Sequence, residues 1–160
     1  MISKHKLIII FSWITVLCSV LMILALSMQN AEASGETSKA QIETILNAFL
    51  GKENVTEELI LSFQLPMRKI AHFGVYMLLG FSLSNALNVT FKRKLTYLSI
   101  FIAFLYANFD EFCIQNISVG RAPSFTDVLI DTSGAIIGFL FYLLLILLNN
   151  KIKNRKKQQE

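Results

Sequence analysis

Charged residues are scarce in this sequence of 160 residues: Asp, Glu, Lys and Arg make up 16% of it, against 54% hydrophobic residues. A soluble domain usually carries about 25% charged residues and about 45–50% apolar ones. The mean hydropathy of +0.54 points in the same direction. The composition argues against an ordinary soluble domain and predicts a single integral membrane domain over residues 1–160.

Several chemical signals are also missing. Only two cysteines are present, and because Cys18 lies inside one apolar run while Cys113 ends another, no disulfide is expected. The net charge is +4, but the basic residues do not form a patch interleaved with aromatics, so no nucleic-acid binding is expected. There is no H-E-x-x-H metal motif and no G-x-S-x-G nucleophile elbow, so neither a zinc protease nor a serine hydrolase is predicted.

Long apolar runs are abundant. Four are long enough to cross a bilayer, which takes about 20 helical residues, and they cover residues 7–26, 70–89, 95–114 and 125–148. A spanning segment must be helical, because lipid offers the backbone no hydrogen-bond partner. The predicted fold is therefore all-α, a membrane bundle of four transmembrane helices with a short helical extracytoplasmic loop.

The first run also resembles a signal peptide, with a basic start and a small-residue "AEA" at residues 31–33. Its apolar stretch of about 20 residues exceeds the about 7–15 residues of a signal-peptide core. We therefore favour a first helix that is retained in the protein.

Basic residues predict the orientation, because Lys and Arg are enriched in cytoplasmic loops. They gather at the N-terminus, in the "KRK" of residues 92–94 and in the tail of residues 149–160, which four crossings would place on one side. The loop of residues 28–67 instead has two lysines against six glutamates. Both termini are predicted to be cytoplasmic and this loop to lie outside.

The outer loop contains two helical patterns. The first begins with a capping box at Ser38 and Gln41 and stops at Gly51. The second starts at Thr56 and ends before Pro66. We expect these helices to cap the bundle or to lie on the outer membrane surface.

Polar residues of the last three spans gather at one level, near the outer end of the bundle. The members of this group are Lys69, His72, Tyr76, Asp110, Glu111, Gln115, Arg121, Asp127 and Asp131. Helical spacing puts Lys69, His72 and Tyr76 on one face, and the pairs Glu111/Gln115 and Asp127/Asp131 on others. Four acids against two fixed cations leave an excess of negative charge, which must be protonated, hydrated or neutralised by a bound cation.

Small residues lie below this group. Gly134 and Gly138 continue the face of Asp127 and Asp131 in a small-xxx-small pattern, which lets helices pack closely. We expect Gly74 and Gly80 of the second span to receive them.

Intramembrane ionisable residues are functional by default, so the group is interpreted as a ligand-binding site. Two alternatives stay open. One is an enzyme that acts on a lipid-linked envelope substrate with His72 and Glu111 as an acid–base pair. The other is a purely structural partner of another membrane protein, in which the charges clasp the helices together. The acids with one imidazole would suit Mg, Mn, Ca or Zn. A divalent cation is the less favoured alternative, because no metal motif is present.

With these residues assembled, the sequence resembles the VanZ-like family of small bacterial membrane proteins over nearly its whole length. The resemblance rests on "SMQN", "KIAHFGVYMLLG", "DEFCIQNISVGR" and "DVLIDTSGAIIG". It implies that the polar residues above, the glycine stripe and the four spans are family features. The family's acid and glutamine are usually three apart, whereas Glu111 and Gln115 are four apart, so either Asp110 or Glu111 can hold the family's acid position.

The resemblance implies a multi-pass protein of the bacterial cell membrane with a role in the envelope. The family is similar to a protein associated with resistance to teicoplanin, a lipid-bearing glycopeptide. The candidate ligands are a lipid-linked wall precursor, an anionic lipid or a glycopeptide. The protein itself is expected to contact the lipid bilayer, and the identity of any protein partner is unknown.

The predicted topology can be tested with reporters. A fluorescent protein that matures only in the cytoplasm should light up when fused after Glu160, and should stay dark when inserted after Glu53 in the outer loop. Alkaline phosphatase should give the reverse pattern. Phosphatase activity from the C-terminal fusion would overturn the four-crossing topology with cytoplasmic termini.

Overall fold

The computed structural model describes residues 3–29, 31–91, 95–117 and 122–158, apart from the side chains of residues 31–34, 37 and 157. These residues form no strand, and the predicted all-α class is confirmed. The α-helices are α1 (Lys4–Ser27), α2 (Ala31–Leu50), α3 (Glu57–Phe91), α4 (Leu98–Phe109) and α5 (Phe125–Lys157). Shorter turns are the 3₁₀ segments η1 (Lys52–Asn54) and η3 (Gln115–Ile117) and the π-helical turn η2 (Asp110–Ile114).

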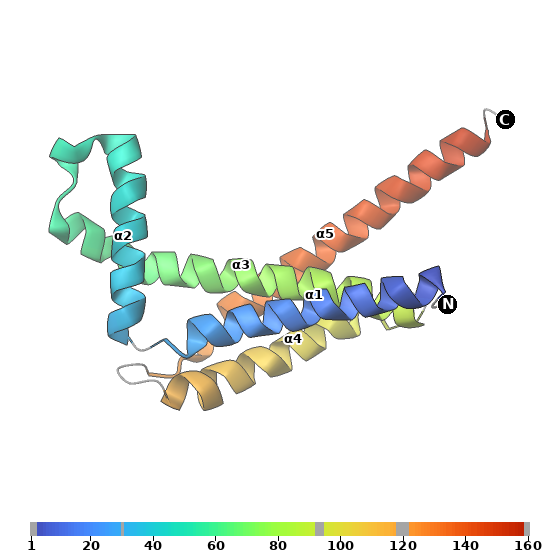
Figure 1. Cartoon of the computed structure of the whole chain (residues 1–160), viewed down its shortest axis with the longest axis horizontal. Helices are drawn as coiled ribbons and strands as arrows, with labels where there is room; N and C mark the ends of the chain where they lie inside the picture. The colour runs from blue at the N-terminus through green and yellow to red at the C-terminus, as the bar shows by residue number, and fades with distance from the viewer. Residues whose placement is uncertain (1–2, 30, 92–94, 118–121, 159–160) are drawn as a thin grey trace.

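Four helical segments of the described chain are long and apolar enough to cross a membrane: Lys4–Ser27, Glu57–Phe91, Leu98–Ile117 and Phe125–Lys156. They agree with the predicted spans, except that the third begins after a turn at residues 95–97. Figure 1 shows α1, α3 and α4 running side by side, with the first half of α5 packed among them. The second half of α5 leaves the bundle toward the C-terminus.

Helix α2 runs across the end of the bundle and does not follow the direction of the other helices (Figure 1). The predicted start at Ser38 was wrong, because α2 already begins at Ala31, so the capping pattern lies inside the helix. The predicted stop is confirmed: Gly51 has a φ of 78°, a conformation that glycine adopts without strain.

Helix α3 begins where predicted but does not end before Pro66. The Thr56 hydroxyl caps its first turn by accepting from the Leu59 N–H at 3.3 Å. Pro66 removes one backbone hydrogen bond, but the turns before it are held against α2, so the helix continues. Gln64 Nε2 donates to the Gly35 carbonyl at 3.3 Å, and Lys39 Nζ lies 2.6 Å from Glu57 Oε1.

Glycines bring α3 and α5 into close contact. A Cβ atom on Gly80 would lie 2.7 Å from the Ala135 Cα, and one on Gly138 would lie 2.9 Å from the Phe81 nitrogen. A Cβ atom on Gly134 would lie 3.1 Å from the Phe73 carbonyl carbon. Close packing through Gly134 and Gly138 is confirmed, but Gly80 receives Ala135 and neither of these glycines. Gly74 was wrongly included, since a Cβ there would meet nothing within 4 Å.

A stripe of small polar residues packs α1 onto its neighbours. Its buried face consists of Ser12, Val16, Ser19, Ile23 and Ser27. Asn85 Nδ2 of α3 donates to the Ser12 Oγ at 3.0 Å, and Ser27 reaches the far end of α4, as described below. Serines allow close helix approach and form hydrogen bonds across membrane helices. Helix α1 is therefore an integral part of the bundle.

Gly138→Ala and Gly74→Ala form a matched pair for the contact between α3 and α5. The methyl group added in Gly138→Ala would clash with backbone atoms of α3. We therefore expect the free energy of unfolding to fall by about 1–3 kcal/mol. Gly74→Ala should be neutral or stabilise by up to about 1 kcal/mol, because alanine favours the helix. Thermal unfolding of both variants in detergent measures the difference. Equal melting temperatures would contradict this packing.

Candidate functional site

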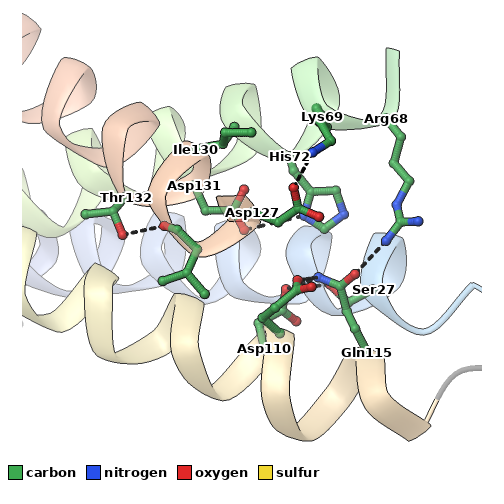
Figure 2. A network of polar contacts seen from close by, with 12 residues as sticks. Ser27, Arg68, Lys69, His72, Asp110, Gln115, Asp127, Ile130, Asp131 and Thr132 are labelled. Carbon is green, nitrogen blue, oxygen red and sulfur yellow. Dashed lines mark hydrogen bonds and ion pairs between the residues drawn. The ribbon is translucent and has the colours of Figure 1, made fainter. Parts of the chain in front are cut away.

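Polar side chains from four helical segments meet at one end of the bundle, where α1 ends, α4 passes into η2 and η3, and α5 begins. Figure 2 shows them facing one another between the ribbons. We call this group the polar cluster: Ser27, Arg68, Lys69, His72, Asp110, Glu111, Gln115, Asp127 and Asp131. Asp110, Glu111, Gln115 and Asp131 are all at most 3% exposed.

The π-helical turn η2 places the acids of α4. After Phe109 the helix widens, and the Gln115 N–H donates to the carbonyl five residues back, at Asp110, instead of four. The wider turn rotates the residues that follow, so Asp110, Glu111 and Gln115 all point into the bundle.

Gln115 connects the acids to a cation. Its Nε2 donates to Glu111 Oε2 at 2.5 Å and to Asp110 Oδ2 at 3.3 Å. Its Oε1 accepts from Arg68 Nη2 at 2.6 Å. The predicted shared face of Glu111 and Gln115 is confirmed, and both Asp110 and Glu111 contact the glutamine.

Two further contacts fix the start of α5. Glu111 Oε1 accepts from the backbone N–H of Ser124, the residue that precedes α5, at 2.9 Å. At the rim, Lys69 Nζ lies 2.5 Å from Asp127 Oδ1. Both side chains of this pair are partly exposed, so the pair contributes only about 0–1 kcal/mol. Its main effect is to position Lys69 at the rim.

His72, Asp110 and Asp131 form the buried interior of the cluster. Asp110 Oδ2 accepts from the Ser27 Oγ at 2.8 Å. His72 Nδ1 lies 3.8 Å from Asp131 Oδ2, which is too long for a hydrogen bond. Within the described chain, His72 Nε2, Tyr76 OH, Asp110 Oδ1 and Asp131 Oδ2 are buried without a hydrogen-bond partner. Buried polar atoms are paired in the great majority of cases, so these atoms call for a partner such as water, an ion or a ligand group.

Two small cavities adjoin these side chains. One, of about 20 Å³, is lined by Arg68, Lys69, His72, Gln115, Asp127, Ile130 and Asp131. The other, of about 150 Å³, lies between α1, α2 and α3, and Arg68 and His72 line it as well. Pockets for drug-sized ligands measure about 300–1,000 Å³. The cluster therefore has room for an ion or one headgroup-sized moiety.

The structure brings together nearly all the residues predicted for the site. Lys69, His72, Asp110, Glu111, Gln115, Asp127 and Asp131 meet in the cluster, and Tyr76 lies one helical turn deeper, fully buried. Arg121 lies outside the described residues, as do residues 92–94.

Sequence reasoning missed two members of the cluster, Arg68 and Ser27. Arg68 is four residues before His72, a spacing that puts both on one helix face. Ser27 ends the first span at the level where the acids gather, so its depth was the available signal.

A model of the VanZ/LLP1 family matches residues 11–147, which include the cores of all four apolar helices and the whole polar cluster. The chain belongs to the VanZ/LLP1 family. This VanZ/LLP1 chain, with its four apolar helices, is accordingly a multi-pass membrane protein. No curated protein and no solved structure matches it.

Ser27→Ala and Ser19→Ala test the link between α1 and Asp110. Both serines are fully buried on one face of α1, but Ser19 Oγ donates only to the Thr15 carbonyl of its own helix. Ser27→Ala removes a donor from a buried carboxylate, which we expect to lower the free energy of unfolding by about 1.5–3 kcal/mol. Ser19→Ala should cost less than about 1 kcal/mol. Thermal unfolding in detergent compares them, and equal losses would contradict the special role of Ser27.

Proposed function

We propose that this VanZ/LLP1 protein binds the anionic headgroup of a cell-envelope lipid at its polar cluster. The observation that supports this most directly concerns Arg68. Its guanidinium donates to a neutral amide, that of Gln115, and among the described residues no carboxylate lies within 4.0 Å of it. A guanidinium has five donors in a planar fork that suits phosphate. Arg68 thus keeps both charge and donors for an anion.

The surroundings of Arg68 support the same ligand. Lys69 shares the smaller cavity with it, and His72 shares both cavities. A phosphate or carboxylate at this position would meet Arg68 and Lys69, while amines or hydroxyls of the headgroup would meet the acids. The exposed apolar sides of α1 and α3 would contact the lipid chains.

The size of the cavities separates the candidate ligands. A glycopeptide is much larger than either cavity, whereas a phosphate group suits the larger one, of about 150 Å³. The smaller cavity, of about 20 Å³, has room for little more than one water molecule or an ion. A contribution to teicoplanin resistance would therefore act through the envelope lipid bound here. A lipid-linked wall precursor and an anionic phospholipid share the same phosphate chemistry.

We further propose that the cluster faces the outside of a bacterial cell, with both termini in the cytoplasm. The support is the excess of acidic residues between residues 28 and 67 and the basic residues at the opposite end. Helix α2 crosses the bundle end with Phe49 84% exposed, which suits a helix lying at the lipid headgroups.

An enzyme that uses His72 and Glu111 is supported less well. Both oxygens of Glu111 already accept hydrogen bonds, from Gln115 and from Ser124. The carboxylate that lies near His72 is that of Asp131, whose Oδ2 is 3.8 Å from His72 Nδ1, and not that of Glu111. A purely structural role, in which polar contacts hold the helices together, would account for the contact of Ser27 with Asp110 and of Lys69 with Asp127. It would not account for the buried polar atoms that lack a partner.

Arg68→Gln and Lys52→Gln are a matched pair that tests lipid binding. Each removes one positive charge, but of these two residues Arg68 lines the cavities and Lys52 does not. Native mass spectrometry of the full chain would count bound phosphatidylglycerol and phosphatidylcholine. The wild type should prefer phosphatidylglycerol, and Arg68→Gln should weaken that binding about 10- to 100-fold, since a charge-assisted hydrogen bond contributes about 1.5–3 kcal/mol.

Lys52→Gln should bind phosphatidylglycerol like the wild type, because Lys52 is exposed on η1. Equal binding by Arg68→Gln and Lys52→Gln would overturn the proposed function. Expressed at equal membrane abundance, Arg68→Gln should also lose any protection against teicoplanin that the wild type gives.

A further inference from the structure

Three buried side chains from three different segments converge beneath the smaller cavity. They are His72 of α3, Asp110 of η2 and Asp131 of α5, and each can place one ligand atom within 4.8 Å of the others. Figure 2 shows the three side chains pointing toward the same space between the helices. We propose that they bind one divalent transition-metal ion, Zn²⁺ or Mn²⁺.

The donor set decides the class of ion. Two carboxylates and one imidazole combine hard oxygen donors with a nitrogen donor. Ca²⁺ and Mg²⁺ are bound almost entirely by oxygen, whereas an imidazole suits Zn²⁺ and its transition-metal neighbours. Three protein ligands are also the number found in zinc sites that keep a position open for water or substrate.

The unpartnered atoms point to a ligand independently of the donor set. Asp110 Oδ1, Asp131 Oδ2 and His72 Nε2 have no hydrogen-bond partner in the part of the chain that the structure describes. His72 is 6% exposed, Asp131 1% and Asp110 0%. Leaving such atoms unpaired costs about 1–3 kcal/mol each, and more for a charged group. A metal coordinated by Asp110 Oδ1, Asp131 Oδ2 and one imidazole nitrogen would occupy the lone pairs of the two carboxylate oxygens and remove their cost.

Neighbouring hydrogen bonds already hold one ligand in place. Asp110 uses its Oδ2 to accept from Ser27 and Gln115, which leaves Oδ1 directed elsewhere. Metal-binding carboxylates are commonly oriented in this way by partners of their second oxygen.

The charge of the interior also calls for a cation. Asp110, Glu111 and Asp131 are buried together, and no Lys or Arg of the described residues lies within 4.0 Å of their carboxylates. Glu111 has both oxygens occupied by N–H donors, but Asp110 and Asp131 do not. One dication would balance these two carboxylates, and buried charges in a membrane protein are otherwise costly.

Small side-chain movements would complete the coordination. The ligands of one Zn²⁺ lie about 2.0–2.2 Å from it, and so about 3–4 Å from each other. His72 Nδ1 and Asp131 Oδ2 are 3.8 Å apart, inside that range. The widest separation of 4.8 Å requires a shift of about 1 Å, which rotation of one carboxylate supplies.

An open position on the ion would face the cavity lined by Arg68 and Lys69. If the proposed lipid function holds, a phosphate oxygen could occupy that position. This last step rests on the proposed function, whereas the metal site itself does not.

The test uses the full chain in detergent, stripped with a chelator and reloaded with Mn²⁺ or Zn²⁺ in the absence of lipid. Electron paramagnetic resonance follows Mn²⁺, and elemental analysis after gel filtration counts Zn²⁺. We expect one ion per chain, with affinity reduced at least about 100-fold in Asp110→Asn and Asp131→Asn. Glu58→Gln, which removes an exposed acid at the same end of α3, should bind like the wild type.

Circular dichroism and gel filtration establish whether each variant folds. If the Asp variants do not fold, the result for the wild type is the test. A wild type that retains neither Mn²⁺ nor Zn²⁺ overturns the metal site and favours a proton shared between Asp110 and Asp131. Equal affinity in Asp131→Asn and Glu58→Gln overturns it as well.

Phosphatidylglycerol binding is measured separately, with and without chelator. If lipid binds while the wild type takes up no metal, only the metal site fails. If metal binds and lipid does not, only the lipid function fails.

Discussion

The burial of carboxylates at one end of a membrane bundle is the constraint on which the rest of the structure depends. Charged groups inside a membrane protein cost several kcal/mol unless they are paired or hydrated. Two of the buried acids have specific donors around them: the Ser27 hydroxyl and the Gln115 amide at Asp110, and the Gln115 amide and the Ser124 N–H at Glu111. These donors come from α1, from η3 and from the residue before α5, so satisfying the acids also fixes how the segments meet.

Helix packing and site geometry are the same feature along α5. Asp127, Asp131, Gly134 and Gly138 lie on one face, and its glycines let α5 approach the α3 backbone at Phe73 and Met77. These positions lie one to five residues after His72, so close packing there carries Asp131 to within 3.8 Å of the imidazole. The close approach of the α3 and α5 backbones in the membrane interior thus determines the distance between His72 and Asp131 at the end of the bundle.

The spans, the glycine contacts and the common level of the polar residues could be predicted from the sequence, because hydropathy and helical periodicity determine them. The start of α2 could not, since a local capping signal at Ser38 lies within a longer helix. Passage of α3 through Pro66 depends on tertiary contacts with α2, which no local rule contains. The π turn at Asp110 has no sequence signature either, although the buried Asp110 and Glu111 lie in it.

The hydrogen bond between Ser27 and Asp110 joins residues 83 positions apart. During synthesis α1 enters the bilayer long before Asp110 leaves the ribosome. The acid-bearing end of the third span therefore arrives beside a donor that is already in place. A chain without the first helix would have to insert the third span with Asp110 lacking its Ser27 donor.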